Sequence, residues 1–225
     1  MGVRFDFNFP VAKGALTVLL LFCISLGSFK TQAHNRTKTV ALELLESRPH
    51  IDRHGEIADL PLARALAYLD RYGKNFKNKT YMAVVDFTLN SLKPRFFLVN
   101  IRTGAVEAYA VAHGKGSDPR HSNNARQFSN RVGSNATSIG FYRTGETYWG
   151  SHGISQRLDG LSSTNSNARP RGLVIHTAKY VGVNSAPGRS NGCFALGSRA
   201  NDRVIRKLGK GALIYAYGGP GQGDR

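Results

Sequence analysis

The stretch GLVIHTAKYVGVNSAPGRSNGCFAL, residues 172–196, decides how the rest of the chain is interpreted. It places a histidine, His176, at the end of a short apolar run and a cysteine, Cys193, directly after a glycine. The only other cysteine is Cys23, in the N-terminal apolar segment. A thiol nucleophile needs a base, a turn that exposes its sulfur and hydrogen-bond donors for a developing oxyanion. This stretch can supply all three.

His176 is the candidate base. A free thiol has a pKa of about 8.5, so little of it is thiolate at neutral pH, whereas an imidazole changes its protonation in this range. A carboxylate or a backbone carbonyl must hold the ring in one tautomer, and the lack of a nearby acidic residue favours a carbonyl. Gly192 allows a sharp turn before Cys193, and such turns often direct consecutive N–H groups at one point.

A structural role for His176 and Cys193 is the alternative, because free cysteines are commonly buried and inert. One histidine and one cysteine form a weak pattern by spacing alone. The polar, flexible residues 188–191 are unlike a core, so both interpretations stay open on the residues alone.

Size and charge narrow the class of protein. The 225 residues suffice for one sizeable domain with small attachments, and 25 glycines favour a strand-rich fold. A formal net charge of +17 implies an anionic partner. Nucleic acid is not expected, because the Lys and Arg residues are spread along the chain without an aromatic-interleaved RNA motif. A wall polymer or an anionic membrane surface explains the charge equally well.

Residues 1–33 have the three parts of a secretory signal peptide. Arg4 and Lys13 precede the apolar residues 15–26, and small residues lead to Ala33. We therefore expect export to the periplasm or cell envelope, with membrane anchoring as the alternative if this segment is not cleaved. Cleavage after Ala33 would leave Cys193 as an unpaired cysteine, which in an exported protein indicates a reactive thiol or an intermolecular bridge.

Periodicity predicts helices first and strands afterwards. Residues 40–45 form a short amphipathic turn, and a helix from Asp59 to about Tyr72 has Asp59 as its cap. Strands are expected at 81–87, 95–101, 105–112, 172–176 and 212–217, and a short helix at 201–208. Residues 113–150 are glycine-rich, and their aromatic residues indicate ordered loops over a groove.

The chain resembles the murein L,D-transpeptidase catalytic domain family. Ile175-His176 followed by the residues GRSNGC at 188–193 looks like the active-site signature of L,D-transpeptidases. Further matching stretches lie at 113–117, 128–130, 140–142, 150–153 and 211–217. The resemblance implies a mainly β fold, a mixed sheet or sandwich with a short N-terminal helical segment and a few short helices. The expected parts are a signal peptide or anchor (1–33), a helical segment (34–77), the catalytic domain (78–218) and a flexible tail (219–225).

By this resemblance, Cys193 is the nucleophile, His176 its base and the Thr177 carbonyl the group that orients the base. Backbone N–H groups near Asn191 and Gly192 would hold the oxyanion. Commoner family members carry a histidine where this chain has Asn191, which removes a second possible proton carrier. The branch often has proline where this chain has Phe194, a change that touches only local packing.

The substrate implied by the resemblance is a peptidoglycan stem peptide, with no cofactor. A carbapenem is expected to acylate the same thiol. Arg189, as a carboxylate clamp, and Ser190, His152 and Tyr142 are the expected substrate-binding residues, although Arg189 also fits a solvated loop and His152 a structural role. The alternatives are an L,D-carboxypeptidase or other wall hydrolase with the same thiol, and a non-catalytic wall-binding module. Zinc catalysis by the histidines is not expected, because no metal-ligand spacing is present.

Overall fold

A computed structural model describes residues 39–40, 42–181, 189–220 and 222. The predicted signal segment (1–33) and most of the predicted tail (219–225) lie outside the described residues. The chain divides into two compact units, Met1–Val40 and Ala41–Arg225. The fold described below is that of the second unit. No helix among the described residues is long and apolar enough to cross a membrane.

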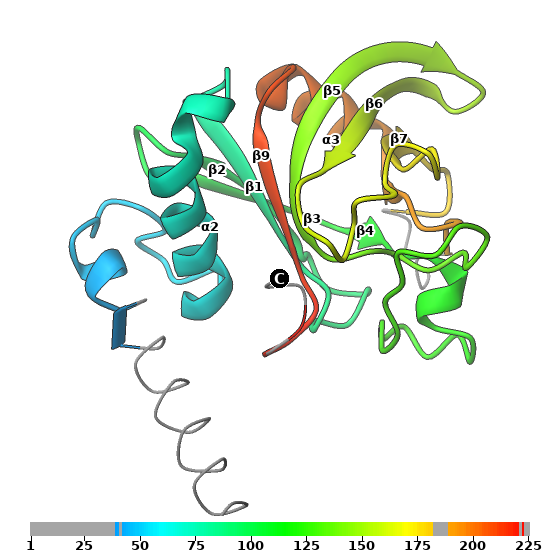
Figure 1. Cartoon of the computed structure of the whole chain (residues 1–225), viewed down its shortest axis with the longest axis horizontal. Coiled ribbons are helices and arrows are strands. Elements are labelled where there is room, and N and C mark those ends of the chain that lie inside the picture. The colour runs from blue at the N-terminus through cyan, green and yellow to red at the C-terminus, as the bar shows by residue number, and fades with distance from the viewer. Residues whose placement is uncertain (1–38, 41, 182–188, 221, 223–225) are drawn as a thin grey trace, which may run out of the picture. The chain divides into compact units, whose positions relative to one another are not determined.

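One mixed sheet forms the centre of this unit (Figure 1). Its nine described strands run in the order β3-β2-β1-β9-β5-β6-β7-β8-β4. Their bounds are β1 Tyr81–Asp86, β2 Phe96–Asn100, β3 Val106–Tyr109, β4 Val111–Ala112, β5 Gly140–Gly150, β6 Gly153–Gly160, β7 Val174–Thr177, β8 Phe194–Leu196 and β9 Leu213–Tyr217. The β1–β9 and β7–β8 pairs are parallel and the other pairs antiparallel. The predicted mainly β, mixed-sheet fold is confirmed.

The sheet nearly closes on itself. Strands β3 and β4 form its two edges, yet only Ala110 separates them in the chain. Since one residue spans at most about 3.6 Å, the two edges must lie next to each other. The predicted strand at 105–112 is therefore two strands, because Val106–Tyr109 pairs with β2 whereas Val111–Ala112 pairs with β8.

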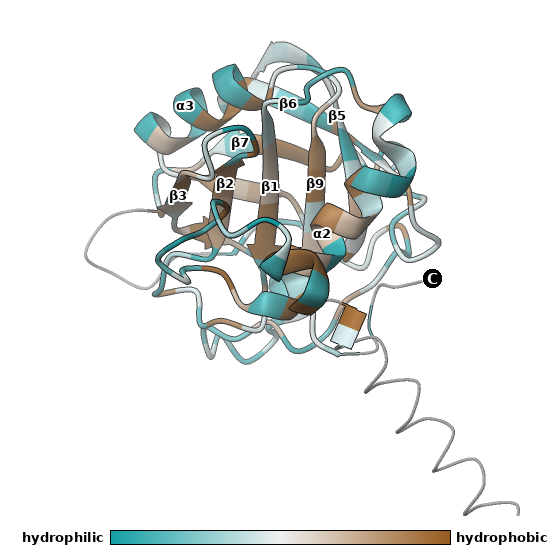
Figure 2. Cartoon of the chain, turned by 90° about the vertical axis from the view of Figure 1, so that its left-hand side faces the viewer, coloured by the Kyte–Doolittle hydropathy of each residue, from teal (hydrophilic) through white to brown (hydrophobic). Residues whose placement is uncertain are grey.

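The helices α2 (Asp59–Tyr72) and α3 (Ser198–Leu208) contact different sets of strand residues. The side chains of a strand alternate between the two faces of its sheet. Accordingly Met82 and Val84 of β1 pack in one core cluster with residues of α2, and Ala83 and Val85 pack in another with residues of α3. Figure 2 shows α2 lying across the β1 and β9 strands. Two-sided burial explains the continuous apolar run of β1.

Helix α2 follows the predicted bounds but not the predicted cap. Its N-cap residue is Ala58, and Asp59 lies in the first turn without a side-chain capping bond. There the carboxylate charge still favours the helix, because the first turn carries the positive end of the helix dipole. Two short 3-10 helices, η1 (Gly73–Asn75) and η2 (Lys115–Ser117), are also present. Residues 42–46 are helical as well, within the stretch 40–45 predicted as a short amphipathic turn and one residue beyond it.

The prediction of loops throughout 113–150 was wrong for its last part. Residues 140–150 form β5, the longest strand described, which pairs with both β9 and β6. Glycine and threonine residues interrupt the alternation of apolar and polar side chains along β5. The register of its pairing with β6 also shifts between Thr144 and Thr147. Strands β6 and β8 were also not predicted. The hairpin formed by β5 and β6 turns at Ser151 and His152, and Gly153 supplies the positive φ of 75° that this tight turn uses.

Candidate active site

The pairing of β7 with β8 brings His176 and Cys193 together. The two strands are parallel, with Ile175 opposite Phe194 and His176 opposite Ala195. Ile175 and Phe194 are fully buried in the core. Because side chains alternate along a strand, His176 and Cys193 project from the other face of this strand pair.

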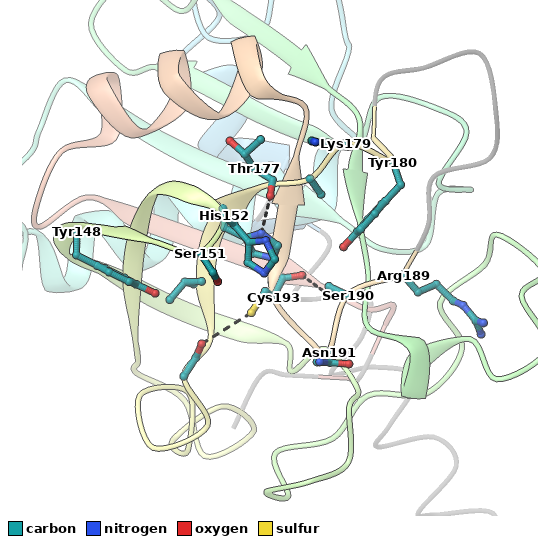
Figure 3. A pocket seen from close by; sticks show the side chains of 14 residues that line it. Tyr148, Ser151, His152, Thr177, Lys179, Tyr180, Arg189, Ser190, Asn191 and Cys193 are labelled. Carbon is teal, nitrogen blue, oxygen red and sulfur yellow. Dashed lines mark hydrogen bonds between the residues drawn. The ribbon is translucent and has the colours of Figure 1, made fainter.

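That face opens into a pocket of about 670 Å³ (Figure 3). The lining comes from the hairpin tip, from β7 and the residues after it, and from the turn before β8. It consists of Tyr148, Ser151, His152, Gly172, Val174, His176, Thr177, Ala178, Lys179, Tyr180, Arg189, Ser190, Asn191 and Cys193. None of these described residues has a carboxylate side chain, whereas two, Lys179 and Arg189, have basic side chains.

His176 has a defined tautomer. Its Nδ1 lies 2.8 Å from the main-chain oxygen of Thr177, as a carbonyl orienter requires. A carbonyl can only accept, so Nδ1 carries the proton and the lone pair lies on Nε2. Burial lowers the pKa of His176, the Thr177 carbonyl raises it and His152 lowers it. The residue is only 6% exposed, and this burial favours the neutral, proton-accepting form of the ring over the imidazolium.

His152 lies against His176. The two ring centroids are 4.7 Å apart and the planes are tilted by 31°. Both histidines line the same pocket as Cys193 (Figure 3). The hairpin tip thus places the predicted groove residue His152 in contact with the candidate base.

Cys193 is a free, partly exposed thiol. Its Sγ lies 3.8 Å from the main-chain oxygen of Gly172. Burial raises the pKa of the thiol, and the main-chain N–H groups of Val174 and Cys193, together with the charge of Arg171, act in the opposite direction. With its pKa raised, the thiol ionises little at neutral pH, so its reactivity depends on proton transfer to a base.

Ser190 holds the turn before Cys193 in shape. Its hydroxyl accepts from the N–H of Gly192 at 3.0 Å and donates to the main-chain oxygen of Cys193 at 2.8 Å. Its own N–H donates to the main-chain oxygen of His113, and its carbonyl accepts from the N–H of Lys115. The side chain lies at the pocket wall but is buried, and its hydroxyl already makes both of these hydrogen bonds within the turn. Its hydroxyl therefore serves the turn in this structure.

The backbone conformation at position 192 requires a glycine. Its φ is 120°, in the region that favours glycine, and a Cβ there would lie 2.8 Å from the main-chain oxygen of Ala136. Its N–H, a predicted oxyanion donor, is engaged by Ser190. The neighbouring Asn191 is exposed and lines the pocket.

Arg189 lies at the rim of the pocket. Its Nη1 donates to the main-chain oxygen of Asp118, and Figure 3 shows the guanidinium directed away from Cys193. Residues 182–188, which precede it, lie outside the described residues.

Tyr142 does not line the pocket, and its predicted role in substrate binding is wrong. It is fully buried on β5, its hydroxyl lies 2.7 Å from that of Ser138, and its ring packs edge-on against Phe194. A side chain without exposed surface cannot contact a substrate. Tyr142 instead supports, from within the core, the strand that follows Cys193.

Of the four histidines considered for zinc, His152 and His176 are in contact and the other two lie in different surroundings. His113 is buried against Arg95, whereas His121 is exposed. Within the described residues, no group of three or more His, Cys, Asp or Glu side chains could hold a metal ion.

Sequence reasoning did not single out Lys179 and Tyr180 as pocket residues. They follow β7 by two and three positions, and only the fold turns them toward the cavity. Tyr148 was expected only as one of several groove aromatics. The contact between His152 and His176 has no signal in the sequence, because it depends on a hairpin that was predicted as a loop.

A sequence model of the L,D-transpeptidase catalytic domain matches residues 55–217. The chain belongs to this family. The match begins at residue 55, inside the helical segment expected at 34–77, and the domain boundaries given above stay predictions. Among curated proteins, no sequence matches the chain.

Solved L,D-transpeptidase structures resemble the chain at low identity. An LD transpeptidase in complex with imipenem is 16% identical (TM-score 0.39) over 61% of this chain and 59% of its own. The L,D-transpeptidase from Mycobacterium smegmatis is 14% identical (TM-score 0.40) over 62% of this chain and 59% of its own. That from Stackebrandtia nassauensis is 18% identical (TM-score 0.39) over 73% and 68%. The chain thus spans 59% of the length of the first two, and its family membership rests on the sequence match.

Proposed function

We propose that this family member is an exported peptidoglycan L,D-transpeptidase, with Cys193 as nucleophile and His176 as general base. The observation that carries the proposal is the β7–β8 pairing, which puts a thiol and a neutral histidine on one face at the same pocket. The 2.8 Å contact to the Thr177 carbonyl leaves Nε2 of His176 free to accept a proton.

In the first step, His176 takes the thiol proton and the sulfur of Cys193 attacks the carbonyl carbon of a stem-peptide bond. A C–S bond forms, the C–N bond breaks, and the imidazolium returns its proton to the departing amine of the terminal D-amino acid. The product is a thioester. Of the predicted oxyanion donors, the Gly192 N–H would have to leave the Ser190 hydroxyl, whereas Asn191 stands at the open side of the pocket. One such donor contributes about 10²–10³ in rate.

In the second step, an amine from another stem attacks the thioester and His176 accepts its proton. The C–S bond breaks, the thiol is restored and a new peptide bond cross-links two stems. Water in place of the amine would give a shortened stem and make the protein a carboxypeptidase. Both reactions use the same two side chains, so products distinguish them.

Charge supports an anionic substrate. The pocket is lined by Lys179 and Arg189 and by no carboxylate among the described residues, and the chain carries a net charge of +17. Peptide stems that end in carboxylates complement such a surface. Arg189 would need to turn from the Asp118 carbonyl to clamp a carboxylate.

The test of the proposed function uses the full chain with purified disaccharide-tetrapeptide, followed by mass spectrometry. We expect a cross-linked dimer from the parent and from Cys23→Ala, and none from Cys193→Ala. A shortened monomer made only when Cys193 is present would establish the hydrolase instead. If all three proteins form the same product, the thiol is not the nucleophile. If none of them forms a product, binding of the parent and of Cys193→Ala to insoluble peptidoglycan would identify a wall-binding module.

Inhibitor acylation tests the thiol without the natural substrate. One solved LD transpeptidase was obtained in complex with imipenem, and we propose that a carbapenem binds here and acylates Cys193. Intact-mass spectrometry should show one adduct on the parent and on Cys23→Ala. No adduct over several hours would contradict an open, activated thiol at this position.

Export is tested by the mature N-terminus. If the signal segment is cleaved as proposed, sequencing of the protein recovered from the cell envelope should begin at His34. A start at Met1 with the protein held in the membrane fraction would establish an anchor.

A further inference from the structure

Arg171 is a partly buried cation next to the site, and the mechanism above does not use it. Its Nη1 donates to the main-chain oxygen of Ser129 at 2.6 Å. Its Nη2 donates to the Ser134 hydroxyl at 3.3 Å and to the main-chain oxygen of Ala136. All three acceptors are neutral. Within the part of the chain that the structure describes, no acidic side chain forms an ion pair with Arg171.

An uncompensated charge of this kind is unusual, because partly buried cations are normally paired with anions. Arg169, only two residues earlier, shows the common arrangement: it is exposed and donates to both Glu146 and Asp159. The guanidinium of Arg171 is instead held by neutral groups, so its positive charge remains available to a neighbouring anion.

The neighbour in question is the turn that carries Cys193. A Cβ built on Gly192 would lie 3.2 Å from Nη2 of Arg171, which places the guanidinium directly beside the residue before the cysteine. Gly172, which follows Arg171 in the chain, also contacts the cysteine, with its main-chain oxygen 3.8 Å from Sγ of Cys193. The Arg171 side chain therefore lies beside Gly192, the residue before the cysteine, and its chain neighbour Gly172 contacts the sulfur itself.

We infer that Arg171 is a positioning residue whose uncompensated positive charge favours the thiolate of Cys193. The three neutral acceptors fix the guanidinium in place and tie residues 129–136 against the turn. The thiolate of Cys193 is then the counter-ion of Arg171, which has no other among the described residues. The charge of Arg171 lowers the pKa of Cys193 against the effect of burial. In turn, burial lowers the pKa of Arg171, and Cys193 is one of the groups that raise it. The inference rests on the proposed role of Cys193, but its test reads the thiol without any wall substrate.

Other titratable groups also face the thiol. His176 projects from β7, His152 from the β5–β6 turn and Tyr180 from the segment after β7, while Lys179 and Arg189 stand at the pocket wall and Tyr142 lies behind in the core. All are retained in the variants below, so a change in the ionisation of Cys193 reports on position 171.

The experiment measures the rate of alkylation by iodoacetamide as a function of pH, on the full chain, with peptide mass spectrometry to follow Cys193 separately from Cys23. The variants are Arg171→Gln, which removes the charge, and Arg171→Lys, which keeps it but cannot bridge three acceptors with one planar group. Arg169→Gln is the matched control, because it removes a nearby arginine whose charge is already paired.

For Arg171→Gln we expect the alkylation profile to move to higher pH, with a rate at pH 7 at least about threefold below the parent. Arg171→Lys and Arg169→Gln should keep the parent profile within about a factor of two. The peptide that contains Cys23 should be alkylated equally in all four proteins.

Two outcomes would overturn the inference. The first is a folded Arg171→Gln whose profile superimposes on that of the parent, which would leave Arg171 a purely structural tie. The second is a folded Arg171→Lys whose profile moves as far as expected for the charge loss, since a retained charge should preserve it. This second variant decides the question even if Arg171→Gln does not fold.

Discussion

The Nδ1 atom of His113 lies 2.7 Å from Nη2 of Arg95, with both side chains buried. A guanidinium can only donate, so Nδ1 of His113 accepts and its proton is on Nε2. Nε2 faces Oδ2 of Asp118 at 3.5 Å. Because the main-chain oxygen of His113 accepts from the N–H of Ser190, this buried pair stands directly behind the turn of Cys193. Arg95, the residue before β2, also donates to the main-chain oxygens of Leu89 and Val111, and these bonds hold its side chain in place.

The first prediction concerns stability and pH. Burial, and then the charge of Arg95, lower the pKa of His113 to about 4, against an ordinary value of about 6.5. Between these two values the unfolded chain binds the proton and the folded chain does not. Stability is therefore complete above pH ~6.5 and is lost as the pH falls toward ~4, by about 3 kcal/mol in all. Urea unfolding at pH 7 and pH 4.5 measures the loss.

The matched pair for this prediction is His113→Gln and His121→Asn. A glutamine side chain does not titrate, so the loss of stability of His113→Gln between the two pH values should be clearly smaller than that of the parent. His121 is exposed with a φ of 52°, which asparagine tolerates. His121→Asn should therefore lose as much stability between the two pH values as the parent does. Equal slopes in all three proteins would mean that His113 is not the group that titrates; His176, whose pKa burial also lowers, would then be examined in the same way.

The second prediction concerns the Ser190 hydroxyl. Ser190→Ala leaves the N–H of Gly192 and the main-chain oxygen of Cys193 without their partner. Each lost bond of this kind costs about 1 kcal/mol. We expect carbapenem acylation to slow about tenfold or more, because the turn that orients the thiol loosens. Ser151→Ala, at the same pocket but on the exposed hairpin tip, serves as the control and should change the rate less than threefold. Equal rates in both variants would remove Ser190 from the positioning of Cys193.

The third prediction compares two glycines with positive φ. Gly192→Ala should destabilise the protein by about 2 kcal/mol or more, because its φ of 120° is strained for alanine and its Cβ would lie 2.8 Å from the main-chain oxygen of Ala136. Gly133→Ala, with a φ of 76° and open space around the new Cβ, should cost only about 1 kcal/mol. Thermal unfolding separates the two, and an equal cost would show that the space near Ala136 readily relaxes.

The fourth prediction concerns the base. His176→Ala should slow acylation of Cys193 by about 10²-fold or more at pH 7, since a positioned base contributes 10²–10⁴ in general. A base acts in its neutral form, which exists above its pKa; because burial lowers that pKa, the parent rate should persist below the ordinary histidine range and fall only at more acid pH. His152→Ala should slow acylation less than His176→Ala, because it removes only the ring that packs 4.7 Å from the ring of His176.

Stopped-flow or mass-spectrometric acylation across pH 4–8 would check this order. A rate for His176→Ala equal to that of the parent would remove His176 from the mechanism. A larger loss in His152→Ala than in His176→Ala would exchange their roles.

The sequence by itself determined the elements whose pattern is local. The runs at β1, β2, β7 and β9 are apolar and β-branched, and α2 repeats its leucines at helical spacing, so strand and helix were predicted near their observed bounds. The chemistry of His176 and Cys193 could also be proposed from residue types and from the family signature, because a signature is a local string of residues.

Only the tertiary structure decided which residues meet. The contact of His152 with His176 and the position of Arg171 beside Gly192 join segments that are distant in sequence. The division of residues 106–112 into two edge strands follows from pairing with β2 on one side of Ala110 and with β8 on the other. Tyr142 was misplaced for the same reason: it is buried on β5, within a stretch predicted as loops, and packs against Phe194 of β8, a strand that no local pattern predicted. Periodicity reports which face of a strand is apolar, whereas strand order and register are set by pairings across the whole chain, and these pairings build the pocket.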